Sequence, residues 1–338
     1  MTELTHPDSN AARTMSQGKR YAGTILLSRQ FIAAAILLLA GANAFAQDDD
    51  NVIKVDTDLA VFEVTVTDKT GKPVRGLSAS DFRIFEGDSE RPVEFFQPIK
   101  KDDERRPLSV VFALDVSGSM TPEELERLKS AMQTFIDRLG DYDSYFSIMT
   151  FAMDVKTVQP FTNRPDKLRA AFAKLGRDQD GLSTHAYDAV DAGVRMLRKN
   201  APKVIRNRFP KRAVVVISDG FPVGDIVAPE TVIERANAAE SSVYSVILPS
   251  YSNVLGNKRP VLTPFEASGL IERTGGKTFY ANKKDFEMLF KDLADEITGS
   301  YALAFYPSDE TGAKPRDVRI ESKKGFSIRQ NRSTIVTK

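Results

Sequence analysis

Three oxygen-bearing side chains follow one another at the end of an apolar run. The run spans residues 108–114, and Asp115, Ser117 and Ser119 come after it at alternate positions, with Gly118 between the serines. A short, continuous apolar run is typical of a central strand that is covered on both faces. One carboxylate and two hydroxyls would converge at its carboxyl end, where open α/β sheets bind ligands. Such oxygen ligands suit Mg²⁺ or Mn²⁺, and not zinc or copper.

By itself, the pattern Asp-x-Ser-x-Ser has an alternative explanation, because a strand-to-helix turn with capping serines has the same composition. The segment DVSGSM nevertheless resembles the metal-ion-dependent adhesion site of von Willebrand factor type A domains. In that family a threonine from a later loop and an aspartate after a later strand complete the site. Thr184 in GLSTHAYDAV and Asp219 in AVVVISDGFP match them in the family's order. The resemblance covers residues 107–300.

The resemblance implies a role for each of the five positions. Ser117 and Ser119 would ligate the ion directly, and Thr184 would ligate it directly or through water. Asp115 and Asp219 would be ligands or would hold bound waters. One coordination position would stay open for an anionic oxygen, such as an Asp or Glu side chain of a protein partner.

The elements around these residues predict an α/β fold. Residues 213–218 form a second apolar strand ending in an acid, so Asp219 should reach the same sheet edge as Asp115. Thr184 precedes the helical pattern of residues 186–198, where a helix N-cap is its alternative role. We expect His185 beside it to be a rim or packing residue. The other expected helices are 122–139, 165–175, 229–239, 265–274 and 286–297, and the other expected strands are 145–152, 155–161, 243–248 and 278–280.

We therefore predict a doubly wound, mostly parallel sheet flanked by helices over residues 108–299, with a smaller β domain. Residues 47–99 are β-rich, with an expected strand pair at 82–86 and 93–97, and residues 300–338 return to strand character. Neither end has enough strand to bury a core alone, so the two should pair. Through the segment VTVTDKTGKPVRGLSASDFRIFE, residues 52–98 also resemble, more loosely, the N-terminal extension of a bacterial subfamily of secreted von Willebrand type A-related proteins. The charged segment 100–107 is the expected linker, or else a solvated loop, and the polar insertion 249–264 either overhangs the site or, as we favour, is solvated.

The N-terminal 46 residues have the pattern of a secretory signal peptide. A basic start precedes the apolar run 31–40, and Ala44 and Ala46 form a small-residue cleavage site before Gln47. An uncleaved anchor would need about 20 apolar residues. We expect an extracytoplasmic protein, periplasmic or secreted, with no integral membrane span after cleavage; Met15 is an alternative start.

Composition narrows the possible functions. The net charge of +1 offers no electrostatic argument for nucleic acid binding, and the absence of cysteine excludes disulfides and thiolate zinc sites. The sequence favours a metal-dependent adhesion module. The alternatives are a metal-assisted hydrolase, which the scarcity of histidine disfavours, and a subunit of a multiprotein assembly. Coupling to a chaperone-like ATPase would conflict with the signal peptide.

Overall fold

A computed structural model describes residues 59–98, 106–118, 121–139, 143–176, 183–219, 221–248, 251–254, 257–260, 262–281, 286–308 and 315–335. All of them belong to one unit, Ile53–Lys338. The expected signal peptide, the start of the mature chain and Ser119 lie outside the described residues, as does most of the expected linker. None of the helices within these ranges is long and apolar enough to cross a membrane.

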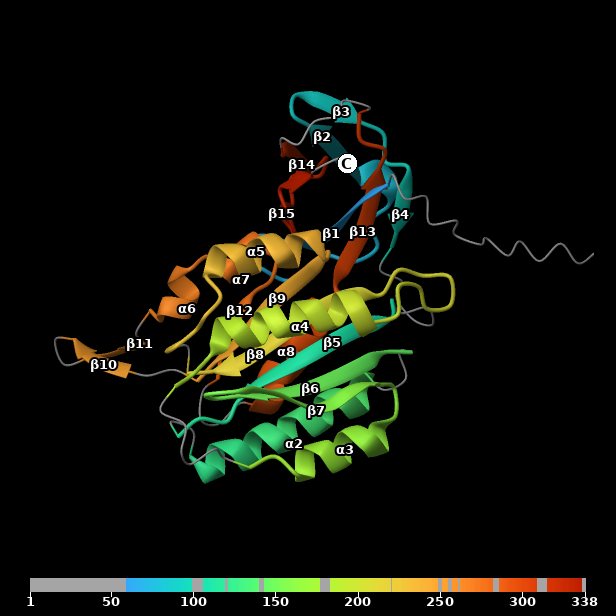
Figure 1. The fold of residues 1–338 in the computed structure, drawn as a ribbon. Coiled ribbons are helices and arrows are strands. Elements are labelled where there is room, and N and C mark those ends of the chain that lie inside the picture. The colour runs from blue at the N-terminus through green and yellow to red at the C-terminus, as the bar shows by residue number, and fades with distance from the viewer. Residues whose placement is uncertain are drawn as a thin grey trace, which may run out of the picture. The chain divides into compact units, whose positions relative to one another are not determined.

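A six-stranded sheet forms the centre of the α/β part (Figure 1), in the order β12-β9-β8-β5-β6-β7. Every neighbouring pair is parallel except β6 with β7, which is antiparallel. The predicted doubly wound, mostly parallel sheet is therefore confirmed. Its strands are β5 (Leu108–Asp115), β6 (Tyr145–Phe151), β7 (Val155–Thr162), β8 (Lys211–Ser218), β9 (Ser241–Ile247) and β12 (Thr278–Tyr280).

Helices cover both faces of this sheet because its strands are apolar on both sides. In β5, Val110, Phe112 and Leu114 point to one core, and Val111 and Ala113 to the other. The first core is closed by α2 (Pro122–Leu139), α3 (Pro165–Ala173) and α8 (Phe286–Thr298). The second is closed by α4 (Ala186–Asn200), α5 (Pro229–Ala238), α6 (Pro264–Ala267) and α7 (Leu270–Arg273).

Strands from both ends of the chain form two further four-stranded sheets, in the orders β15-β1-β13-β4 and β16-β14-β2-β3. β1 lies between β13 and β15, and β2 lies between β14 and β3, so each sheet mixes early and late strands. A third apolar core joins the sheets. The strands are β1 (Ala60–Thr67), β2 (Phe82–Glu86), β3 (Ser89–Arg91), β4 (Phe95–Gln97), β13 (Ser300–Phe305), β14 (Arg316–Ser322), β15 (Ser327–Gln330) and β16 (Thr334–Ile335), with a 3₁₀ turn at Ala79–Asp81.

Two local predictions are corrected. The segment 93–97 does not pair with β2: the turn at Gly87 leads β2 into β3, and β4 pairs with β13 in the other sheet. Pro92, which lacks an N–H, separates β3 from β4. The helix expected at 265–274 is two helices, α6 and α7, because Gly269 between them has a φ of 71°. The insertion 249–264 contains a hairpin of β10 (Tyr251–Val254) and β11 (Asn257–Pro260).

Buried charges connect the terminal strands to the α/β part. The Arg106 guanidinium forms a two-pronged ion pair with Glu63 of β1 and donates to the carbonyl of Phe209 at 2.8 Å. Both partners of the pair are less than 9% exposed. In the same region, Arg329 of β15 pairs with Glu296 of α8. Because each buried charge depends on its partner, loss of one would leave the other uncompensated.

Lys211, at the start of β8, is a buried cation in this region. Its side chain is 1% exposed, and Nζ lies 5.3 Å from the centre of the Tyr244 ring. Burial lowers the pKa of Lys211 from 10.5 to about 8, although Glu63 and Glu296 act in the opposite direction. The unfolded chain therefore takes up this proton at a higher pH than the folded chain does. Stability should rise as the pH increases from about 8 to 10.5, and the full penalty should persist below that window.

We predict that Lys211→Met stabilises the protein at pH 7, by about 1–3 kcal/mol, since Glu63 and Glu296 keep their arginine partners. The rise in unfolding free energy between pH 8 and 10.5 should also flatten. Urea unfolding across this pH range measures both effects. Lys203→Met, at an exposed position, is the matched control and should change neither. A loss of stability in Lys211→Met would contradict the prediction.

Candidate functional site

Asp115 ends β5 and is held by hydrogen bonds on both carboxylate oxygens. Oδ1 accepts the backbone N–H of Ser117 at 2.9 Å, and Oδ2 accepts the hydroxyl of Ser218 at 2.8 Å. The Ser117 side chain also hydrogen-bonds to this carboxylate. Asp115 is 1% exposed and Ser117 3% exposed. The carboxylate is therefore fixed in orientation, with lone pairs left over for a further ligand or a water.

Asp219 reaches the same edge because β5 and β8 are paired in parallel register. Leu114 lies opposite Ile217, so Ser218 stands beside Asp115 and Asp219 follows directly. Its Oδ1 accepts the backbone N–H of Phe221 at 3.1 Å, which closes a tight turn after the strand. The structure thus brings together the two acids that end the two apolar runs.

Thr184 lies in a loop that is tied to both neighbouring strand ends. It exchanges two backbone hydrogen bonds with Val223, at 3.0 and 2.9 Å, in the segment after β8. The next residue, His185, donates its N–H to the carbonyl of Ala152, at 3.1 Å, directly after β6. His185, and not Thr184, occupies the N-cap position of α4. The loops that carry Asp115, Thr184 and Asp219 therefore meet at one sheet edge.

The electrostatics of this edge suit a hard cation. Burial raises the pKa of Asp115, and the nearby charge of Asp219 raises it further, against the lowering effect of the hydrogen bonds from Ser117 and Ser218. A divalent cation would offset both the burial and the repulsion. Asp115, Ser117, Thr184 and Asp219 offer only carboxylate and hydroxyl oxygens, the donors that Mg²⁺ and Mn²⁺ take. Within the described ranges, no group of three or more His, Cys, Asp or Glu side chains is placed to hold a metal.

Asp188, which was not predicted from the sequence, supports the Thr184 loop. Its Oδ1 accepts the N–H groups of Ile226 and Val227 at 3.1 and 2.8 Å, and its Oδ2 lies 3.1 Å from Nδ1 of His185. We expected His185 to be a rim or packing residue. In the structure its ring packs against the Asp188 carboxylate and is mostly buried. An acid three residues after a histidine at a helix start was the available signal. Ser218, the hydroxyl donor to Asp115, was also missed, and it directly precedes the second acid.

Comparison with known proteins identifies the domain. Residues 109–263 match the family model of the von Willebrand factor type A domain. This segment is a von Willebrand factor type A (VWA) domain. Matrilin-3 of Gallus gallus is 30% identical over 153 residues, which make up 42% of this chain and 31% of matrilin-3. Inter-alpha-trypsin inhibitor heavy chain H3 of Homo sapiens is 27% identical over 156 residues, which make up 45% of this chain and 17% of that protein.

The chain spans less than a third of the length of either curated relative. Among solved structures, an aerotolerance-related membrane protein from Bacteroides fragilis is 18% identical, with a TM-score of 0.43. The match covers 56% of this chain and 98% of that one. A similarity at this level says nothing about binding or activity.

Gly224 allows the loop after β8 to pass closely over His185. Its φ is 89°, and a Cβ at this position would lie 2.8 Å from Nε2 of His185. A non-glycine residue in the left-handed region costs about 1–2 kcal/mol. We predict that Gly224→Ala destabilises the protein by more than this backbone cost. The His185 ring would also have to move away from Asp188. Thermal unfolding by calorimetry measures the loss.

The matched control is Gly71→Ala. Gly71 has a similar φ of 79°, but a Cβ added there would have nothing within 4 Å, so this variant isolates the backbone cost. Equal losses in the two variants would show that the contact with His185 does not constrain the loop.

Proposed function

We propose that the VWA domain binds a protein partner through a divalent cation, Mg²⁺ or Mn²⁺. The residues that would hold the cation are Asp115, Ser117, Ser119, Thr184 and Asp219. The observation that supports this most strongly is the meeting of the Asp115, Thr184 and Asp219 loops at one edge, tied by backbone hydrogen bonds. Metal binding and adhesion are also what the resemblance of DVSGSM implies.

The cation would supply an attraction for an anionic oxygen, and an Asp or Glu side chain of the partner would meet it. Asp115 stays oriented by Ser117 and Ser218, so little reorganisation of this carboxylate would accompany binding. Neither an enzymatic role nor a role as an assembly subunit has an observation in its favour.

We further propose an extracytoplasmic setting, periplasmic or secreted, in keeping with the signal-peptide pattern before Gln47. The exported protein should begin at Gln47, and mass spectrometry of its N-terminal peptide tests this. A peptide that extends upstream of Ala46 in the exported protein would contradict the proposal.

We predict that partner capture needs the cation and the serine hydroxyls, whereas the fold does not. Chelation, or Ser117→Ala combined with Ser119→Ala, should abolish capture from an outer-membrane or extracellular extract. The melting temperature should shift only by the loss of a bound ligand, because the strands are already packed by two apolar cores. Asp219→Ala should also weaken capture, and millimolar acetate should compete with the partner for the cation.

A separate assay tests for catalysis. Incubation of the protein with generic phosphate, ester and peptide substrates should show no turnover.

Ser130→Ala, at an exposed position of α2, is the matched control and should capture normally. Capture that survives both the chelator and the two serine replacements would show that the partner uses another face of the domain.

A further inference from the structure

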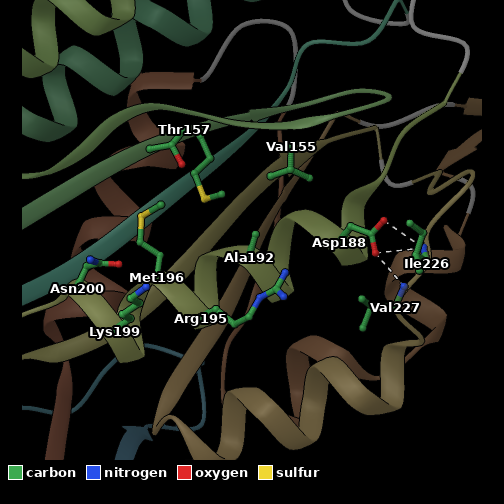
Figure 2. Close-up of a pocket in the computed structure, with 11 residues that line it drawn as sticks. Val155, Thr157, Asp188, Ala192, Arg195, Met196, Lys199, Asn200, Ile226 and Val227 are labelled. Atoms are coloured by element: carbon green, nitrogen blue, oxygen red, sulfur yellow. Dashed lines mark hydrogen bonds between the residues drawn. The ribbon is translucent and has the colours of Figure 1, made fainter.

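A groove runs beside α4 on the face of the sheet that this helix covers (Figure 2). It has a volume of about 600 Å³ and is bordered by β6, β7, α4 and the loop at Ile226 and Val227. This size is within the range of pockets that hold small ligands, and a pocket of that size can receive a few side chains of a bound segment. Figure 2 shows α4 side chains on one side of the groove and Val155 and Thr157 of β7 on the other.

The floor of the groove is apolar and only partly covered. Val155, Ala192, Met196 and Val227 pack against the second core but keep some exposed surface. At the rim, Ile226 is 88% exposed, the most of any large apolar side chain in the described part of the chain. Apolar side chains of a ligand would therefore gain burial here.

The charge that the groove offers to a ligand is positive. The Asp188 carboxylate is engaged by two backbone N–H groups and His185, which leaves Arg195 and Lys199 as the exposed charges of the lining. The side chain of Arg195 is 60% exposed, with Nη2 3.0 Å from Oδ2 of Asp191.

Arg195 can turn toward a second anion without leaving Asp191 unpaired. Arg235 also pairs with Asp191, at 2.8 Å, so this buried acid keeps a cationic partner if Arg195 turns toward a ligand. The groove therefore suits a ligand that combines apolar groups with a negative charge.

One end of the groove lies next to the loops that carry the predicted cation site. α4 begins two residues after Thr184, and Val223, the backbone partner of Thr184, is three residues from Ile226. Exposed apolar side chains continue around this edge: Met153, Val223 and Leu262 are 52%, 54% and 71% exposed. Along the helix, Asp188 and Lys199 mark the two ends of the groove and are eleven positions apart, which is about 17 Å. About five residues of extended chain cover this length.

We propose that the groove holds the segment of the protein partner that flanks its metal-binding carboxylate. That segment is extended, places apolar side chains on Val155, Met196 and Val227, and carries after them a second acidic residue that meets Arg195 and Lys199. The inference rests on the proposed function, because it assigns the partner chemistry of the same edge. It makes the domain selective for an acidic and apolar motif, and not for any exposed carboxylate.

Fluorescence anisotropy of the full chain with a synthetic peptide tests this. The probe is acetylated and fluorescein-labelled, with one aspartate, four apolar residues and two glutamates, and the buffer contains millimolar Mg²⁺. Lys199→Glu should weaken its Kd about tenfold, because an attraction becomes a repulsion. The same variant should leave unchanged the Kd of a probe with glutamines at the two distal positions.

Two sets of controls separate the groove from the rest of the surface. Arg198→Glu makes the same charge change at the neighbouring, exposed position of α4, outside the groove lining, and should change Kd less than twofold. Ala192→Phe should fill the groove and weaken binding of both probes. Met288→Ser, at a 64% exposed apolar residue on α8, should have no effect.

The outcomes distinguish this inference from the proposed function. If chelation abolishes binding but Lys199→Glu acts no more strongly than Arg198→Glu, the groove inference is wrong and the cation site stands. If Lys199→Glu and Ala192→Phe weaken binding while chelator does not, the groove binds the peptide and the cation role is wrong. No detectable binding of the probe at millimolar concentration would overturn the inference.

Discussion

The parallel pairing of β5 with β8 is the constraint on which the candidate site depends. Leu114 stands opposite Ile217, and the apolar side chains of both strands are fully buried against helices on both faces. A shift of one residue would turn Phe112 and Leu114 toward the wrong core and move Asp115 away from Ser218. Packing of the two apolar cores therefore fixes the relative position of the two acids.

The terminal strands impose a second constraint. β1 pairs with β13 and β15, so the α/β part is inserted between segments that must meet for the smaller β domain to form. The boundary is held by the buried ion pair of Glu63 with Arg106 and by the pair of the buried Glu296 with the partly exposed Arg329. Such pairs add little net stability compared with apolar contacts, but they disfavour other arrangements that would leave a charge unpaired. Because these pairs lie between the terminal strands and the α/β part, they favour the one arrangement of the two parts in which every buried charge has its partner.

The first turn of α4 links the candidate cation site to the groove. Asp188 accepts hydrogen bonds from Ile226 and Val227 and lies against His185, the residue after Thr184. One carboxylate thus holds the Thr184 loop and the rim of the groove in a fixed relation. The edge carries carboxylate and hydroxyl oxygens, with exposed apolar side chains nearby and two basic residues along the helix. Charge fixes orientation and apolar burial supplies affinity, so a surface of this kind can recognise more than a single carboxylate.

Local patterns in the sequence were enough to predict the sheet, most of its helices and the shared edge of Asp115 and Asp219, because a buried strand needs an unbroken apolar run and each run ends in an acid. They did not predict the break at Gly269 that separates α6 from α7. Tertiary structure alone decided which strands are partners in the terminal sheets: β4 joined β13, more than 200 residues away, and the turn at Gly87 and Asp88 paired β2 with β3 and not with the segment 93–97. It also decided that Ser218 and Asp188 support the site, and that Met196, Val155 and Val227 meet in a groove. These contacts join residues distant in sequence, and their energy depends on which surfaces the packed cores leave exposed, which no local pattern records.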